Sequence, residues 1–500
     1  MAVAVAAPHM EALAAGERAV REGGNALDAA LAAAAMLTVV YPHQCALGGD
    51  LIALVRSPQG HTTALLAVGT APAGVDDVAG EWSEVPRQGP HAVTVPGMLA
   101  GWRAIEGMGA RRGLRPALAE AAEAARRGSP VSAGLARALA SRADAVLADR
   151  GMREVFAVDG RVREEGESLT QPALAATLSR LAEDPEDFYR GTTAAALVEA
   201  LGAAGGTHAT EDFAAFQPEV VDALTRRVGD RTWSVAPPPS VGAVLLGVVA
   251  HASTGTSARP TGSRLVDAAV RGVQARGALL GDPRVTDVDV EALLSLSSDA
   301  PPVPFTEPRP LGDTAAVTAL DDEGWGVTIV QSVYQTFGSG LMDPQTGILF
   351  HNRGSAFSVD PASPAVIRSG ARPPHTLCPA IVESSETLVV AGCQGGRAQP
   401  WILAQLLPAA ADPAQSLDEI LARPRWIVGD KDLGQPELSL VAEAGVGDDV
   451  RERAAEVGLP VVDLPGRVDE AGHVQIVRAA AGGLQAASDP RADGSGVICG

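Results

Sequence analysis

Aromatic residues and cysteines are scarce in this chain of 500 residues. Phenylalanine, tryptophan and tyrosine make up 3% of it, so alanine, valine and leucine must fill most of the core. The cysteines are too few for a disulfide framework in a chain of this length; they are Cys45, Cys378, Cys393 and Cys499. There is no CxxC pair, HExxH helix or histidine cluster, so the pattern implies no metal and no other cofactor.

Basic charge and long apolar runs are also lacking. The formal net charge of −21 argues against nucleic acid and against anionic membrane surfaces, because both need a density of positive charge. The longest apolar run, Ala29 to Tyr41, is shorter than the roughly 20 residues that span a bilayer. The first ten residues, MAVAVAAPHM, have no basic segment and no room for the apolar core of a signal peptide. We therefore expect a cytoplasmic protein.

The first third of the chain alternates helix and strand signals. Helices are predicted over residues 10–22 and 26–41, with Gly23-Gly24 ending the first. Asn25 and Asp28 have the spacing of a capping box at the start of the second, which is apolar nearly all round and should be buried. Strands are predicted over residues 51–55 and 62–68. Residues 100–300 are dominated by alanine-rich helices, and PPPSVG precedes another buried helix.

The texture changes at residue 301. The segment PPVPFTEPRP has the composition of an extended tether. Strand signals dominate after it, over residues 314–320, 325–333, 380–382 and 388–391. A helix-rich first part with one hairpin and a strand-rich second part favour an α+β architecture, with two central sheets between helical layers.

Thr314 opens the first strand after the tether. A threonine can simply favour a strand, since β-branched residues do. A threonine hydroxyl becomes a nucleophile only when a base removes its proton, and its own α-amine can serve if Thr314 becomes a chain terminus. An α-amine has a pKa of about 7.7–8.0, which suits a general base at neutral pH. This hypothesis requires cleavage between Asp313 and Thr314, and the tether would let the freed end leave.

Several motifs occur together in a specific order. They include GGNALDAALAAAAMLTVVYPHQCALGGD, VPGMLAGW, PPPSVG, GDTAAVTALDDEG, FGSGLMDPQTGILFHNRG, RPPHTLCPA and CQGGRAQP. In this the chain resembles the gamma-glutamyltranspeptidase family of N-terminal-nucleophile hydrolases from end to end. The resemblance implies a four-layer αββα sandwich and a proenzyme that cuts itself into a large subunit, 1–313, and a small subunit, 314–500. It places the catalytic threonine at Thr314.

Further roles follow from the resemblance. The family's second hydroxyl beside the nucleophile falls on Ser332, and its oxyanion-hole glycines fall on Gly395 and Gly396. Glycine lets a substrate carbonyl approach backbone N–H donors closely. Taken alone the glycine pair means little, because Gly-Gly also occurs elsewhere in the chain.

The residues that read a glutamyl group in the family are replaced here. The family's carboxylate-binding arginine after the APA stretch has no counterpart, since that place reads GVDD, with Asp77 or a neighbour. Tyr334 stands in place of its asparagine beyond the second hydroxyl. Arg353 and Ala356 stand in place of its glutamine and aspartate, and His375 and Thr376 in place of its pair of serines. We expect Tyr334, Arg353, His375 and Thr376 to line a different substrate pocket. Alternatively, Arg353 forms an ordinary surface ion pair and His375 is a satisfied core histidine.

These replacements resemble a side branch of the family that includes oxamate amidohydrolase-like enzymes. We expect a self-processing amidohydrolase acting on a small carboxylate-bearing amide, with possible pairing of processed heterodimers into a homodimer. Three alternatives stay open: a gamma-glutamyl hydrolase or transferase acting on glutathione-like substrates, a C–C bond hydrolase in a natural-product pathway, and an unprocessed scaffold.

Overall fold

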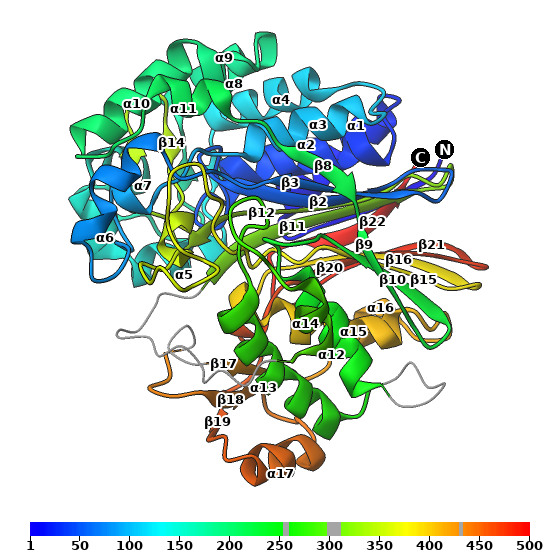
Figure 1. Cartoon of the computed structure of the whole chain (residues 1–500). Coiled ribbons are helices and arrows are strands. Elements are labelled where there is room, and N and C mark those ends of the chain that lie inside the picture. Colours follow the sequence, from blue (N-terminus) through cyan, green and yellow to red (C-terminus); the bar gives the residue numbers. More distant parts are fainter. Residues whose placement is uncertain (254–259, 298–311, 430–433) are drawn as a thin grey trace.

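Two antiparallel sheets stacked face to face form the centre of the molecule (Figure 1). The computed structural model describes residues 1–253, 260–297, 312–429 and 434–500. The first sheet has the order β22 (Ser495–Cys499), β1 (Val3–Ala7), β11 (Gly312–Asp321), β12 (Gly326–Gln335), β2 (Asp50–Arg56), β3 (Thr62–Ala67) and β8 (Glu219–Asp222). The second has the order β21 (Gly483–Ser488), β20 (Val474–Ala480), β16 (Thr387–Cys393), β15 (Ala380–Glu383), β10 (Arg231–Val235) and β9 (Leu224–Val228).

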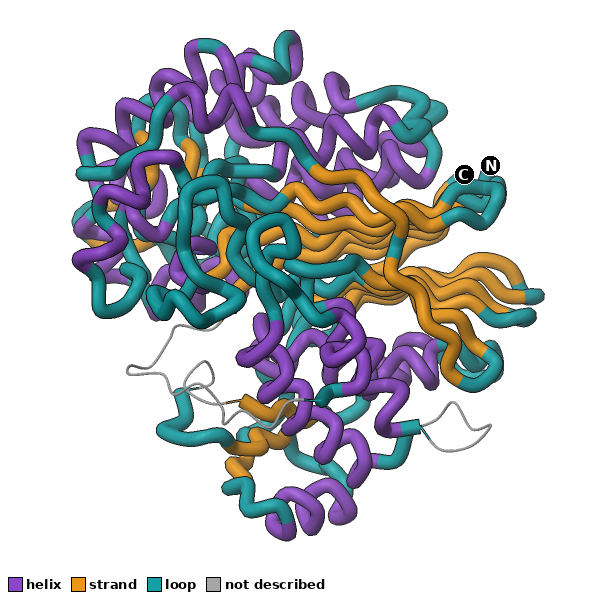
Figure 2. Tube along the Cα trace, viewed as in Figure 1, coloured by secondary structure: helices purple, strands orange, loops and turns teal. Residues whose placement is uncertain are grey.

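Helices cover both outer faces of this pair of sheets, as the purple segments of Figure 2 show. The layer over the first sheet is built on α1 (Met10–Arg21), α2 (Ala26–Val40), α3 (Met98–Gly107), α4 (Leu114–Arg127) and α8 (Pro172–Glu183). Shorter helices extend it: α5 (Ala133–Ser141), α6 (Ala143–Ala148), α7 (Arg150–Phe156), α9 (Asp187–Arg190), α10 (Thr192–Ala203) and α11 (Thr210–Ala215). The layer over the second sheet contains α12 (Gly242–Ala252), α13 (Gly262–Leu279), α14 (Val290–Ser295), α15 (Gln399–Ala410) and α16 (Leu417–Leu421). The predicted αββα sandwich is confirmed.

Helix α2 shows why these layers form. Asn25 accepts hydrogen bonds from the backbone N–H groups of Leu27 and Asp28, and Asp28 accepts from the N–H of Asn25, as the capping box predicts. Every residue of α2 is buried, between the first sheet and the helices α1 and α4. A helix without a polar face is stable only when it is enclosed in this way. In the described residues no helix has the length and apolar character needed to cross a membrane.

The strand predictions are confirmed within a few residues, and most helices do precede residue 312 while strands dominate after it, but the expectation of a single hairpin in the first part is wrong. Residues before 313 supply β1, β2, β3 and β8 to the first sheet and β9 and β10 to the second. Short strands β4 (Ser129–Pro130), β5 (Ala157–Val158), β6 (Arg161–Val162) and β7 (Ser168–Leu169) also interrupt the region expected to be helical. The boundary between 313 and 314 therefore separates two intertwined parts of one sandwich. The proposed tether lies outside the described residues.

A small lobe extends the second helical layer, and a buried charge network anchors it. It contains β17 (Trp426–Gly429), β18 (Ser439–Ala442), β19 (Val461–Asp463) and α17 (Asp448–Glu456). Arg425 pairs with Asp489, Arg491 lies 3.0 Å from Asp489, and Arg491 also pairs with Glu443. All four side chains are buried. Because each charge has a partner, the network joins the lobe to the end of β21 without leaving an isolated buried ion.

Asp489→Ala should lower the stability of the folded chain by about 3–5 kcal/mol, because it leaves two buried arginines without one of their carboxylates. Differential scanning calorimetry measures the change. Asp463→Ala is the matched control, since Asp463 pairs with Arg451 at 2.7 Å on the surface and its side chain is 69% exposed. It should cost less than about 1 kcal/mol. Equal losses in the two variants would contradict the anchoring role of the network.

Candidate active site

Thr314 lies at an irregularity in the pairing of the two central strands. Asp313 pairs with Tyr334 and Ala315 pairs with Gln331, so Ser332 and Val333 on β12 face the single residue Thr314 on β11. This is a β-bulge, a feature that re-aims side chains and is common beside active sites. Directly beyond the bulge, Tyr334 has a φ of 78°, an unusual backbone conformation for a residue with a side chain.

The bulge brings two hydroxyls together in a buried place. The Thr314 hydroxyl donates to Ser332 Oγ at 3.2 Å, and the backbone N–H of Tyr334 donates to the same oxygen at 2.7 Å. Thr314 and Ser332 are 1% and 3% exposed. Strand β11 runs without a break through Asp313 and Thr314, so this is the arrangement of the uncut chain, in which the Thr314 nitrogen is still a peptide nitrogen.

Three of the predicted pocket residues form a line that starts at the bulge. The Arg353 guanidinium lies over the Tyr334 ring, 3.8 Å from its centroid, which is cation–π geometry. The same guanidinium donates to Thr376 Oγ1 at 3.3 Å and to the carbonyl of Pro374. Arg353 is 1% exposed. The alternative of an ordinary surface ion pair for Arg353 is therefore wrong.

His375 is buried beside this line. Its Nε2 lies 3.4 Å from the carboxylate of Asp50, the first residue of β2, which pairs directly with Ser332. Burial and the charge of Arg353 lower the pKa of His375 to about 4, although Asp50 opposes the shift. The imidazole is therefore neutral at physiological pH.

The predicted oxyanion glycines lie where β16 ends. Gly395 and Gly396 have φ values of 151° and 52°, and the short helix η5 (Gly396–Ala398) that follows packs against β11, the strand of Thr314. A Cβ on Gly395 would lie 2.6 Å from Ile402 Cδ1. Rotation of the Ile402 side chain could relieve that contact, so it is the positive φ that favours glycine at this position.

Asp77 and Ala356, which the sequence comparison also singled out, contribute no polar group to this site. Asp77 ends the short helix η1 (Ala73–Asp77) and is exposed. Ala356 ends η4 (Arg353–Ala356), so the place that holds a carboxylate in the family has only a methyl group here. Burial raises the pKa of both Cys378 and Cys393, which argues against either thiol as a nucleophile.

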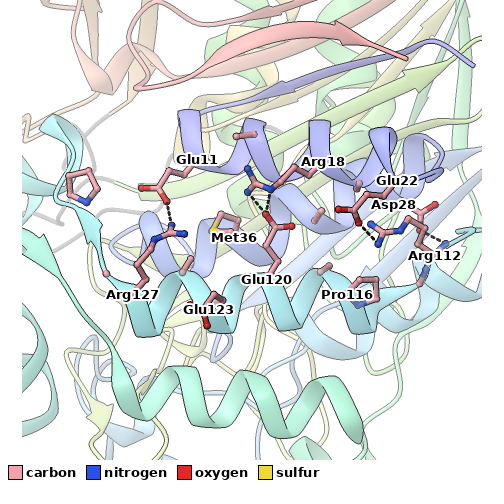
Figure 3. A pocket seen from close by; sticks show the side chains of 18 residues that line it. Glu11, Arg18, Glu22, Asp28, Met36, Arg112, Pro116, Glu120, Glu123 and Arg127 are labelled. Atoms are coloured by element: carbon pink, nitrogen blue, oxygen red, sulfur yellow. Dashed lines mark hydrogen bonds and ion pairs between the residues drawn. The ribbon is translucent and has the colours of Figure 1, made fainter.

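A surface groove of about 730 Å³ lies elsewhere, between α1 and α4 (Figure 3). Its floor is apolar, with Ala32 and Met36 of α2, and none of the predicted site residues lines it. Ion pairs link the two walls: Arg18 with Glu120, Arg112 with Glu22 and Arg127 with Glu11. These charges satisfy one another across the groove, so it has no evident catalytic set.

The sandwich and its likeness to solved enzymes define the class. A solved cephalosporin acylase from Bacillus halodurans superposes with a TM-score of 0.86 at 27% identity, covering 99% of this chain and 95% of that one. The protein is an enzyme of the amidohydrolase type with the N-terminal-nucleophile hydrolase fold.

The chain belongs to the gamma-glutamyltranspeptidase family, whose model matches residues 12–499. It is 35% identical to an oxamate amidohydrolase proenzyme from Klebsiella pneumoniae, over 98% of this chain and 97% of that protein. It is 31% identical to a glutathione hydrolase-like proenzyme, YwrD, from Bacillus subtilis, over 99% and 98% of the two chains.

Sequence reasoning missed the buried polar residues that hold the site in place. Asp50 was visible only as the end of a glycine-rich motif. Asn352 accepts the N–H of Gln335 at 3.2 Å and donates to the Gln335 side chain at 2.7 Å, which fixes the end of β12. His351 faces Asp50 at 3.5 Å. The available signal was their position in the chain: His351 and Asn352 directly precede Arg353, and Asp50 directly follows Gly48-Gly49.

Gly395→Ala should lower kcat by about 10²–10³, the loss that removal of one oxyanion donor produces, because alanine disfavours the φ of 151° that holds this turn in place. Gly482→Ala is the control, since Gly482 has open space where a Cβ would lie. Steady-state kinetics on both purified variants provide the comparison. Unchanged turnover in Gly395→Ala would remove these glycines from the catalytic site.

Proposed function

We propose that the chain is a self-processing amidohydrolase whose nucleophile is Thr314. The observation that carries the proposal is the hydrogen bond from the Thr314 hydroxyl to Ser332 at a buried bulge, directly after the peptide bond that must be cut. In processing, Thr314 Oγ attacks the carbonyl carbon of Asp313 and the peptide nitrogen leaves, which gives an ester. Water hydrolyses the ester and releases fragments 1–313 and 314–500, with a free amine on Thr314.

Turnover then uses the new amine as the general base. The amine takes the proton of the Thr314 hydroxyl, the oxygen attacks the substrate carbonyl, and the backbone N–H groups of Gly395 and Gly396 stabilise the oxyanion. The proton passes to the leaving nitrogen and the C–N bond breaks. Water, activated by the same amine, resolves the acyl-enzyme. These steps need no metal or organic cofactor.

The substrate we propose is a small amide with a carboxylate and no amino group, such as oxamate. The buried guanidinium of Arg353 supplies a cation in the line that starts at the bulge, and a planar guanidinium suits a carboxylate. Oxamate and water would give oxalate and ammonium. The similarity to an oxamate amidohydrolase proenzyme, over nearly the whole of both chains, supports this choice.

A glutamyl substrate is the second candidate, because another relative is named as glutathione hydrolase-like. A glutamyl group carries an ammonium beside its carboxylate and needs acceptors for it. Ala356 offers none, and the cation at Arg353 would repel the ammonium. A C–C bond hydrolase could use the same nucleophile, and assays that detect ammonium release distinguish it from an amidohydrolase.

Thr314→Ala should abolish both self-cleavage and turnover, whereas Thr314→Ser should retain part of each, because it keeps a hydroxyl and an amine. Loss of the nucleophile typically costs several orders of magnitude in kcat. Intact-mass measurement after prolonged incubation follows cleavage, and release of ammonium from oxamate follows turnover. A Thr314→Ala protein that still matured into fragments 1–313 and 314–500 would refute the mechanism.

Arg353→Ala should reduce kcat/KM for oxamate by roughly 30-fold to several thousand-fold, the loss of about 2–5 kcal/mol for a buried charged hydrogen bond, and Arg353→Lys should recover only part of it. Arg478→Ala is the matched control, because Arg478 is equally buried but bonds the carbonyls of Ala410 and Asp412 far along the chain. Efficient glutathione cleavage by the wild type, or an Arg353→Ala variant with normal kinetics, would overturn this assignment.

A further inference from the structure

Asp50 is a buried carboxylate directly beside the candidate catalytic pair. It begins β2, pairs in register with Ser332 and is 1% exposed. Its Oδ1 accepts the backbone N–H groups of Gly69 at 3.0 Å and Gly97 at 3.3 Å. A carboxylate this deep is costly unless hydrogen bonds and charges compensate its lost hydration, so its remaining oxygen needs donors as well.

The second oxygen of Asp50 faces two imidazoles. Asp50 Oδ2 lies 3.5 Å from His351 Nδ1 and 3.4 Å from His375 Nε2. None of these three buried atoms has another hydrogen-bond partner within the described parts of the chain. The stable arrangement of such a group directs an N–H of each ring at the carboxylate, because an oxygen facing two ring lone pairs would be repelled. Burial opposes ionisation of Asp50, but His351, His375 and the backbone N–H of Gly69 together lower its pKa.

The other nitrogen of His375 fixes which tautomer is present. The backbone N–H of Leu377 points at His375 Nδ1 at 3.4 Å, and an N–H can only donate. Nδ1 must therefore carry the lone pair, and the single proton of the neutral ring lies on Nε2, toward Asp50. The backbone of His375 is held as well, since its N–H donates to Pro239 at 2.7 Å and its carbonyl accepts from Val241 at 3.0 Å.

We propose that Asp50 is a positioning residue, which fixes His375 in its Nε2–H form as a neutral wall of the substrate pocket beside Arg353 and Thr376. The placement of His375 in the substrate pocket rests on the proposed function, whereas the assignment of its tautomer does not. A ring fixed in this way adds no second positive charge next to Arg353. On this side of the pocket the guanidinium of Arg353 alone then binds the substrate carboxylate. The imidazole of His375 limits the shape of the pocket and holds a fixed orientation.

Asp50→Asn tests the idea with almost no change in volume. If the asparagine oxygen keeps its bonds to Gly69 and Gly97, its NH₂ group meets the N–H groups of both rings, and His375 must change tautomer or rotate. We expect KM for oxamate to rise at least tenfold while kcat changes less than threefold. The rate of self-cleavage should change less than twofold, because that reaction does not use the substrate pocket.

Asp321→Asn is the matched control. Asp321 is as buried as Asp50, but its partners are the backbone N–H groups of Ala26, Glu323 and Trp325 at the far end of β11. This variant measures the general cost of neutralising a buried carboxylate, and it should leave KM unchanged. An equal rise of KM in both variants, or no rise in Asp50→Asn, would overturn the positioning role.

Imidazole ¹⁵N NMR of histidine-labelled protein gives a readout that does not depend on activity or on a stable Asp50 variant. His375→Gln assigns the signal. In the wild type, His375 should show a protonated Nε2 and an unprotonated Nδ1 from pH 5.5 to pH 8, and Asp50→Asn should abolish that pattern. A protonated Nδ1, or titration of His375 near neutral pH, would refute the inference. If oxamate is not turned over but the tautomer is as stated, the proposed substrate fails and the Asp50–His375 pair stands.

Discussion

The pairing of β11 with β12 is the constraint on which the site depends. Strand β11 lies in the middle of the first sheet, between β1 and β12, and its side chains pack on one face against α2 and on the other against the second sheet. A strand buried on both faces cannot slip by one residue without exposing its apolar side chains to the wrong layer. The register therefore fixes where Thr314 lies before any catalytic residue is considered.

The bulge between β11 and β12 depends on this fixed register. Two residues of β12 oppose Thr314, so the Ser332 side chain reaches the threonine hydroxyl and the following N–H of Tyr334 reaches Ser332. The positive φ of Tyr334 is a local strain that the surrounding pairing must hold. On the far side of β12, Asp50 of β2 is in register with Ser332, so one row across three strands carries the proposed nucleophile, its partner hydroxyl and the buried carboxylate.

The sequence predicted the parts of the molecule that local rules determine. The capping box at Asn25, the buried helix after it and the strands around Thr314 follow from residue spacing and β-propensity, and the structure has all of them. The strand β1 was missed because a short run of alanine and valine does not distinguish strand from helix. Asp50 and His351 could not be assigned, since the Asp50 carboxylate and the two histidines that it faces lie hundreds of residues apart along the chain. Such contacts arise only from the stacking of the sheets and loops.

The proposed catalytic residues and the proposed pocket residues lie in different kinds of structure, and they therefore differ in how readily they can be substituted. The positions of Thr314 and Ser332 are set by the register of the central strands, and the turn at Gly395 by its positive φ. Arg353, His375 and Thr376 lie in the short helix η4 and in the loop before β15, where a new side chain must satisfy only its immediate neighbours. A buried arginine is tolerated there because a tyrosine face, a hydroxyl and a carbonyl meet it. The proposed substrate pocket can therefore change on these two segments while the proposed nucleophile stays where the central sheet holds it.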